Sequence, residues 1–277
     1  MEKYWIIANE KKDQSLAVTG RIRELIETQG AAAEVYCTNE EGKVMLPETC
    51  ERVKCVFTVG GDGTLIQAAR SLIGRSVPVL GINRGTLGYL TEVDIQNLEA
   101  AVAQVMRNAF MTEERMMLCG ILPDGRVDVA LNDIVVSRHG SVKILSYLVY
   151  VNGEFLNAYQ ADGIIVSTPT GSTAYNLSAG GPIVEPTAAM IVITPICSHA
   201  LNTRSIVLSA EDRIEIEIGE GRGYGNEVAE AAFDGGDIAC IRTGERIMIQ
   251  RADVTTKLVK LSKVSFLETL REKMKGK

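Results

Sequence analysis

The residue types best suited to chemistry stand in one short run, Gly60-Gly61-Asp62-Gly63-Thr64. An apolar run at 55–59 predicts a buried strand before it, and apolar residues at helical spacing predict a helix that begins at Thr64. A strand that ends in glycines and restarts as a helix is a common phosphate-binding arrangement, because free N–H groups at the helix start face the ligand. The glycines also let a ligand approach the main chain closely.

The carboxylate in this turn needs a separate explanation. Asp62 would repel a phosphate group, so it suits a site in which it holds Mg²⁺ or accepts the proton of an attacking hydroxyl. The alternative is structural, namely a strand-to-helix turn in which Asp62 caps the helix. The spacing of these residues does not choose between the two.

Two polar residues, Asn132-Asp133, interrupt an otherwise apolar run, Leu131–Ser137, in the strand predicted at 127–137. An amide and a carboxylate buried in a strand without partners would be costly. They therefore either line a site or form a turn, and for the dipeptide alone the turn is the simpler explanation.

Hydroxyl groups and glycines are dense in Ser167–Pro182, which follows Asp162-Gly163 and a predicted strand at 164–166. Hydroxyls and turn N–H groups donate hydrogen bonds to phosphate and ribose oxygens without adding charge. A flexible surface loop is the alternative. We favour the binding role, because the segment contains apolar residues that a solvated loop would not need. These are Ala174, Leu177 and Ala179.

The elements that must position these residues differ between the two halves of the chain. In the first half, strands alternate with helices, which implies a parallel sheet with helices on its faces and ligands outside the carboxyl ends of the strands. The Gly60–Thr64 turn and a second glycine-rich turn, Gly81–Leu90, fall at that edge. The strands are predicted at 4–8, 33–37, 55–59 and 77–82, the helices at 14–29, from 64 and at 95–107, and a loop with a short helix at 38–52.

The second half contains short strands and little helical spacing, which predicts a mostly antiparallel β domain. Asn152-Gly153 is a strong hairpin signal, and the amphipathic tail at 266–275 predicts a helix. The strands are predicted at 116–122, 127–137, 144–151, 164–167, 190–194, 205–208, 213–218, 228–233 and 245–251.

The expected fold class is therefore α+β with two domains. Residues 1–109 would form an N-terminal α/β, Rossmann-like domain with a parallel sheet. Residues 110–261 would form the C-terminal, mostly antiparallel β domain. The C-terminal helix, within 262–277, would pack back on the first domain.

Composition narrows the functional classes. The chain has 277 residues, 46% of them hydrophobic, and a net charge of -6 without a basic run, so we expect a sizeable core and no nucleic-acid partner. Six cysteines without a CxxC pair indicate reduced thiols in a cytoplasmic protein. No apolar run approaches membrane-spanning length, so no membrane partner is expected. With only two histidines, a histidine-centred mechanism has little to work with.

The motifs resemble those of a known enzyme group. Gly60–Thr64 resembles the GGDGT signature of a kinase superfamily that contains the NAD kinases, the diacylglycerol and sphingosine kinases and, more distantly, the 6-phosphofructokinases. Asn132-Asp133, Asp162-Gly163 and Ser167–Pro182 resemble, in the same order, further motifs of the bacterial NAD kinases. The resemblance implies an ATP-dependent enzyme that phosphorylates the 2′-hydroxyl of the adenosine ribose of NAD and forms NADP.

The resemblance also implies a role for each motif. Asp62 would accept the proton, Asn132 and Asp133 would hold a ribose of NAD, and Gly60–Thr64 would face the ATP phosphates while Mg²⁺ neutralises the transferred group. Asp62 and the hydroxyl-rich segment would converge on one ribose. No residue is assigned as a metal ligand, and a homodimer or homotetramer is implied. The residues expected to bind the nucleotides are Gly60, Gly61, Asp62, Gly63, Thr64, Asn132, Asp133, Lys143, Gln160, Asp162, Thr173, Ala174, Tyr175, Asn176, Leu177 and Ser178.

Two other functions are open on the sequence alone. One is a lipid or sugar kinase of the same superfamily, against which the long hydroxyl-rich segment counts. The other is an NAD-binding regulator without activity, in which Asp62 only grips ribose. The chain has no Walker A pattern, so ATP must be held differently from the way P-loop enzymes hold it. It also departs from common family patterns at Gln160 and Gly236.

Overall fold

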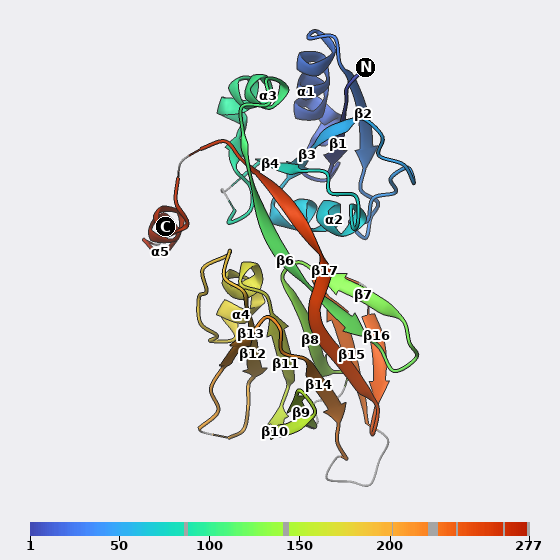
Figure 1. Cartoon of the computed structure of the whole chain (residues 1–277), viewed down its shortest axis with the longest axis vertical. Coiled ribbons are helices and arrows are strands. Elements are labelled where there is room, and N and C mark those ends of the chain that lie inside the picture. The colour runs from blue at the N-terminus through green and yellow to red at the C-terminus, as the bar shows by residue number, and fades with distance from the viewer. Residues whose placement is uncertain are drawn as a thin grey trace. The chain divides into compact units, whose positions relative to one another are not determined.

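The computed structural model describes residues 1–85, 88–140, 144–200, 202–220, 227–236, 238–262 and 264–275. The chain divides into two compact units (Figure 1). Unit 1 consists of Met1–Arg115 and Thr255–Lys277, and unit 2 of Met116–Val254. Two long strands, β6 (Met111–Ile121) and β17 (Arg246–Lys260), each run from one unit into the other. The domain limits predicted from the sequence, after residues 109 and 261, lie near the ends of these strands in unit 1, at Met111 and Lys260.

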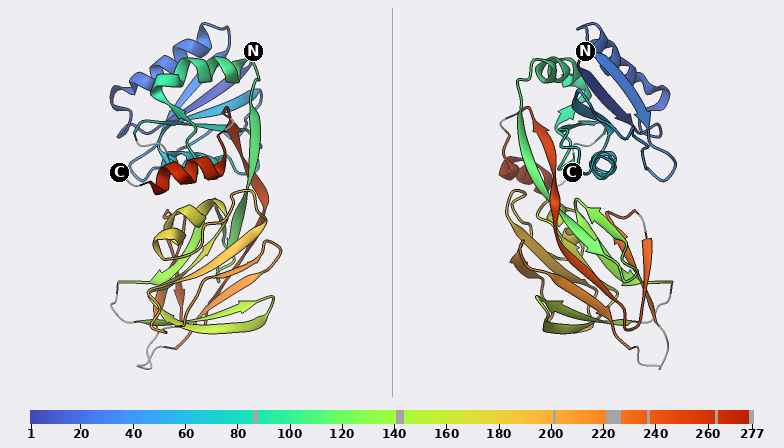
Figure 2. Two further views of the ribbon diagram at one scale, coloured as in Figure 1. Left: turned by 90° about the vertical axis from the view of Figure 1, so that its left-hand side faces the viewer. Right: turned by 45° about the vertical axis from the view of Figure 1, so that its right-hand side comes forward.

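Unit 1 is a parallel sheet with helices on both faces, as the alternating sequence pattern predicts. The strand order is β4-β3-β1-β2, every pair is parallel, and the end of β17 adds to β4. Helices α1 and α3 cover one face and α2 covers the other (Figure 1 and Figure 2). The bounds are β1 Lys3–Ala8, α1 Ala17–Glu27, β2 Ala32–Cys37, β3 Val53–Gly60, α2 Asp62–Ser71, β4 Val79–Asn83, β5 Val93–Asp94 and α3 Leu98–Met106.

Burial on both faces explains why the central strands read as continuous apolar runs. All five residues of β4 are buried, and so are the last six of β3. The helix residues Ile22 and Val102 are fully buried in the same cluster as Phe57 of β3. This core fixes the carboxyl ends of the strands, where the glycine-rich turns begin.

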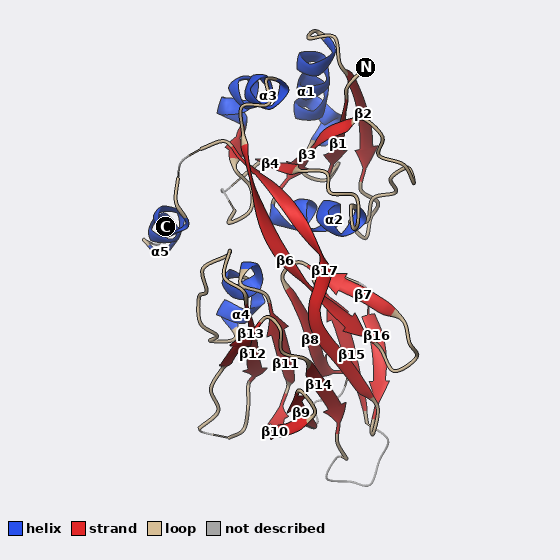
Figure 3. Cartoon of the chain, viewed as in Figure 1, coloured by secondary structure: helices blue, strands red, loops and turns tan. Residues whose placement is uncertain are grey.

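Unit 2 is almost entirely antiparallel β structure (Figure 3). One sheet has the order β13-β12-β11-β8-β15-β16, and β10-β9-β14-β17 form a second run. Asn152 and Gly153 both have positive φ, 52° and 82°, and join β9 to β10 as the hairpin signal predicts. The bounds are β7 Val127–Ala130, β8 Asp133–Arg138, β9 Leu145–Val151, β10 Glu154–Ala161, β11 Gly163–Ser167, β12 Met190–Ile196, β13 Ile206–Ser209, β14 Ile214–Ile218, β15 Val228–Phe233 and β16 Ile238–Arg242.

Several local predictions are wrong. Helix α2 begins at Asp62, two residues before Thr64, because Gly61 takes the extended N-cap conformation. Residues 38–52, all described, contain no helix, since the Asn39 side chain accepts the N–H groups of Glu41 and Lys43 and holds a turn instead. The run at 127–137 breaks into β7 and β8, and β17 extends well beyond residue 251.

The C-terminal helix α5, Phe266–Met274, belongs to unit 1 and contains no buried residue. Its side chains therefore contribute little to a hydrophobic core. Among the helices of the described residues, none is long and apolar enough to cross a membrane.

Candidate active site

The glycine turn lies at the carboxyl end of β3 and begins α2. A Cβ atom added at Gly60 would stand 2.2 Å from Thr64 Oγ1, so this position accepts no side chain in the present geometry. Thr64 is 4% exposed, and within the described part of the chain its hydroxyl has no hydrogen-bond partner. A buried polar group without a partner is unusual in a folded protein and often marks the place of a ligand.

The Asp62 carboxylate is held by a second turn rather than by its own helix. Oδ2 accepts the N–H of Tyr89 at 2.8 Å, and Oδ1 accepts those of Leu90 and Thr91 at 3.2 and 3.1 Å. A Cβ at Gly88 would lie 1.8 Å from Oδ1, so the turn closes on the carboxylate only because residue 88 is glycine. The capping alternative is wrong, since Gly61 is the N-cap and no side chain caps α2. The three N–H groups fill three of about four acceptor positions of the carboxylate.

Two cations reach the same edge from the loops after β1 and β4. Arg84 Nη1 donates to the buried Asp13 at 3.1 Å, and Asp13 in turn accepts the N–H of Thr19 at 2.9 Å in α1. Lys12 Nζ is within 2.9 Å of where a Cβ of Gly61 would stand. No hydrogen bond or ion pair of this ammonium group is found with any residue that the structure describes.

In unit 2, a carboxylate outside the predicted site residues holds the backbone of the Asn132-Asp133 pair. Asp234 accepts the N–H groups of Leu131, Asn132 and Asp133 at 2.8, 2.7 and 3.2 Å. These N–H groups therefore leave the strand ladder, which is why β7 ends before β8 begins. In the sequence, the sign of this turn is the dipeptide Asp234-Gly235 directly after a buried strand. In the structure, both residues adopt positive φ.

The side chains of the pair have different environments. Burial first and the nearby Asp234 carboxylate second raise the pKa of Asp133 to about 7. Asn132 Oδ1 is buried and, in the described part of the molecule, accepts no hydrogen bond. The turn explanation is correct for the backbone, whereas the amide oxygen of Asn132 is a buried polar atom of the kind that is rarely left without a partner.

The hydroxyl-rich segment is folded and is not a flexible loop. It contains two short helices, Thr170–Thr173 and α4 (Tyr175–Ser178). Most of its hydroxyls form hydrogen bonds to backbone carbonyl groups of the protein: Thr168 Oγ1 donates to Leu131 O at 2.6 Å, and Ser172 Oγ donates to Pro169 O at 2.6 Å. A Cβ at Gly171 would stand 2.1 Å from Asn132 O, so the segment packs directly on the Asn132-Asp133 turn.

The predicted binding residues within α4 divide into inward and outward positions. Asn176 is fully buried, and its amide donates to Ser172 O and Pro182 O and accepts from Thr194 Oγ1. Tyr175 and Leu177 are 46% and 38% exposed, so Leu177 is not the apolar anchor that we expected. Ser178 is also exposed, whereas Thr173 and Ala174 are half-buried.

Asp162 lies away from the Asn132-Asp133 turn. In the β8–β11 pair, Asp133 faces Ser167, whereas Asp162 precedes the Gly163 that faces Ser137. The two residues are therefore at opposite ends of the pair, five residues apart along the strands, which is about 17 Å at 3.3 Å per residue. Asp162 accepts a hydrogen bond from Arg138 Nε at 3.0 Å, and Gln160 is exposed beside it on β10. Lys143 lies outside the described residues.

A parallel sheet with a Gly-Gly-Asp-Gly-Thr turn at its carboxyl edge, followed in the chain by an antiparallel β unit, defines a two-domain kinase of the GGDGT class. Models of the ATP-NAD kinase N-terminal and C-terminal domains match residues 11–110 and 131–261. The chain belongs to the ATP-NAD kinase family, and its activity is the ATP-dependent phosphorylation of NAD. This membership sets aside both the lipid-kinase and the regulator alternatives.

Full-length relatives agree with this assignment. The chain is 46% identical to the NAD kinase of Agathobacter rectalis, with 99% of both chains covered. It is 43% identical to that of Lachnospira eligens, with 99% of this chain and all of the relative covered. The structure resembles an NAD kinase from Archaeoglobus fulgidus in complex with ATP, at a TM-score of 0.79 and 25% identity over 99% and 98% of the chains. It shares its fold with yeast NADH kinase complexed with NADH, at a TM-score of 0.87 and 23% identity over 99% and 88%.

Proposed function

We propose that this enzyme transfers the γ-phosphoryl group of ATP to the 2′-hydroxyl of the adenosine ribose of NAD, with Asp62 as the proton acceptor. The observation that carries the proposal is the Asp62 carboxylate, which three backbone N–H groups orient at the carboxyl edge of the sheet. A carboxylate repels phosphate but accepts a hydrogen bond from a hydroxyl group. Its placement in a phosphate-type turn therefore fits a kinase whose acceptor is an alcohol.

In the proposed reaction, the 2′-oxygen forms a bond to the γ-phosphorus while the bond from that phosphorus to the β–γ bridging oxygen breaks. The hydroxyl proton passes to the remaining acceptor position of Asp62, and ADP leaves. Ribose hydroxyls are weak nucleophiles, so orientation and charge neutralisation supply most of the acceleration. Three fixed N–H donors give Asp62 a single orientation without the use of another side chain.

For the ATP phosphates we propose the N–H groups around Gly60, Gly61 and Gly63, the Thr64 hydroxyl and the ammonium group of Lys12. Thr64 Oγ1 lacks a partner within the described residues, and Lys12 Nζ lies beside Gly61. Mg²⁺ would arrive with ATP, since the described residues offer no group of three His, Cys, Asp or Glu that could cage a metal. This agrees with the preference of Mg²⁺ for phosphate oxygens and water over protein-made cages.

For NAD we propose Asn132, Asp133 and the exposed part of α4 as ribose and base contacts. The orphaned Oδ1 of Asn132 supports this role. Asn176, whose amide is satisfied internally, would act by shaping the segment. Lys143, Gln160 and Asp162 stay predicted contacts.

We further propose a homodimer or homotetramer formed through the β unit. Because Asp162 and Asp133 lie at opposite ends of one strand pair, the Asp162 end could serve a site in another subunit. Sedimentation shows whether the chain associates. If the two ends act in different subunits, mixing an inactive Asp133→Asn variant with an inactive Asp162→Asn variant should restore activity, because some mixed sites then contain both native carboxylates. Variants that stay inactive after subunit exchange would contradict this arrangement.

The reaction is tested with ATP, Mg²⁺ and NAD, and an NADP-specific dehydrogenase detects the 2′-phosphorylated product. Asp62→Asn should reduce kcat by at least about a hundredfold and leave the Kd for NAD within about threefold of the parent value. Asp94→Asn, an exposed carboxylate on β5, is the matched control and should keep normal turnover. Near-normal turnover in Asp62→Asn would refute the role of proton acceptor.

A further inference from the structure

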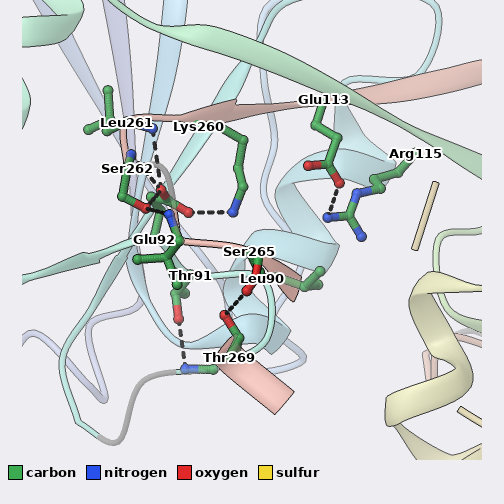
Figure 4. Close-up of polar contacts among 12 residues, drawn as sticks. Leu90, Thr91, Glu92, Glu113, Arg115, Lys260, Leu261, Ser262, Ser265 and Thr269 are labelled. Atoms are coloured by element: carbon green, nitrogen blue, oxygen red, sulfur yellow. Dashed lines mark hydrogen bonds and ion pairs between the residues drawn. The ribbon is translucent and has the colours of Figure 1, made fainter. Parts of the chain in front are cut away.

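The buried carboxylate of Glu92 joins two parts of unit 1 that are far apart in sequence, the segment around residue 92 and residues 260–262 (Figure 4). It accepts Lys260 Nζ at 2.6 Å, Leu261 N at 3.3 Å, and both N and Oγ of Ser262 at 3.0 and 2.7 Å. The Glu92 side chain is only 8% exposed. Burial acts to raise its pKa, but the hydrogen bonds from Lys260 and Ser262 outweigh burial and keep the pKa below its ordinary value.

Glu92 is the residue that follows the turn on Asp62. Thr91 supplies one of the three N–H groups that hold the Asp62 carboxylate, and its Oγ1 accepts the N–H of Gly88 at 3.0 Å. Glu92 N donates to Gly81 O at 3.0 Å, which ties the same point to β4. The turn at 88–91 is thus attached at its far end to the sheet and, through the Glu92 carboxylate, to residues 260–262.

Helix α5 contacts the same turn from its other end. Lys273 Nζ lies 5.3 Å from the centre of the Tyr89 ring, within the range of a cation–π contact. The helix starts with a Ser265 cap that accepts Glu268 N at 3.2 Å, but it has no buried residue, and Leu267 is 71% exposed. Core packing therefore contributes little to its position, and its cation–π contact is made with Tyr89, a residue of the turn that holds Asp62.

We propose that the described C-terminal residues 260–262 and 264–274 form a positioning element for the catalytic carboxylate. Glu92 and Lys273 act through the turn at 88–91, the first from the side of Thr91 and the second from the side of Tyr89. Both residues act on Asp62 through this turn and are therefore positioning residues. The inference rests on the proposed role of Asp62 as the proton acceptor.

The test uses the full chain with Lys273→Met and Glu92→Gln, each with a matched control. Lys275→Met removes the C-cap lysine of the same helix, which among the described residues pairs locally with Glu272. Glu34→Gln removes a carboxylate that also has several donors in unit 1, namely Lys3, Trp5 and Tyr36 on the strands far from the turn. Because Glu92→Gln could lower stability, activities are compared per folded molecule, and Lys273→Met, at an unburied position, carries the test if Glu92→Gln folds poorly.

Two readouts are required together. In Lys273→Met and Glu92→Gln, kcat should fall about three- to tenfold while KM for ATP and for NAD stays within about twofold, as expected when orientation rather than binding is lost. Hydrogen exchange of the amides of Tyr89, Leu90 and Thr91 should rise at least about threefold, because their bonds to Asp62 open more often. Both controls should match the parent in both measurements.

Unchanged amide exchange, or kcat within twofold of the parent value in both variants, would overturn the proposal. Its failure is distinguishable from failure of the proposed reaction. Normal turnover in Asp62→Asn refutes the proton-acceptor role whatever these variants do. Parent-like exchange at 89–91 in Lys273→Met refutes only the positioning role of the C-terminal segment.

Discussion

Replacement of Asp234 by Asn should destabilise the protein by an amount that depends on pH. If the remaining oxygen takes the place of Oδ1, the bonds to Asn132 N and Asp133 N persist in a weaker, neutral form. The new NH₂ group then faces the N–H of Leu131, which loses its acceptor. One unsatisfied buried donor costs about 1–3 kcal/mol, and the loss of charge from the other two bonds adds to this, so we expect about 2–4 kcal/mol near pH 5.

The effect should shrink at higher pH because of Asp133. Its pKa is raised from 3.8 to about 7, so the folded protein binds more protons than the unfolded chain between these values, and stability falls as the pH rises from about 4 to about 7. Asp234→Asn removes the charge that contributes to this shift, and the pKa of Asp133 should fall. Each unit of that fall recovers about 1.4 kcal/mol above pH 7.

The assay is denaturant unfolding of parent and variant at pH 5 and pH 8, together with carboxyl NMR titration of Asp133. We expect a smaller difference in unfolding free energy at pH 8 than at pH 5, and a lower Asp133 pKa in the variant. Equal destabilisation at both pH values, with an unchanged Asp133 titration, would refute the coupling. A loss below about 1 kcal/mol at pH 5 would show that the three backbone bonds matter less than their geometry indicates.

Three further predictions concern the site. Gly88→Ala should lower kcat at least about tenfold, because a Cβ 1.8 Å from Asp62 Oδ1 must displace the carboxylate or the turn, and steady-state kinetics at saturating ATP and NAD will show it. Lys12→Met should raise KM for ATP about tenfold and leave KM for NAD unchanged, whereas Lys11→Met should affect neither; equal effects of the two variants would contradict the phosphate role. Asn176→Ala should lower unfolding stability by about 2–4 kcal/mol, since it strands several buried partners, and a variant as stable as the parent in thermal unfolding would contradict that structural role.

Local patterns were sufficient where neighbours in sequence decide the structure. The parallel sheet of unit 1 follows from apolar runs that alternate with helical spacing, and the β9–β10 hairpin follows from Asn152-Gly153. The glycine turn and the hydroxyl-rich segment were recognised from residue types at short range. The inward direction of Asn176 and the exposure of Leu177 could not be predicted, because a one-turn helix such as α4 is too short to show an amphipathic period.

The hydrogen bonds that hold the site in place are of one kind, which no local sequence pattern reveals. A carboxylate accepts several N–H groups from a segment far away in sequence: Asp62 from 27–29 residues away, Asp234 from 101–103, and Glu92 from 169–170. Each of these carboxylates replaces a stretch of regular hydrogen bonding with a fixed turn. In the sequence, such a contact is indicated by an acidic residue next to a buried strand or a glycine, but this pattern identifies only the hydrogen-bond acceptor. The donors are backbone groups, which every residue except proline carries, so only the folded chain identifies them.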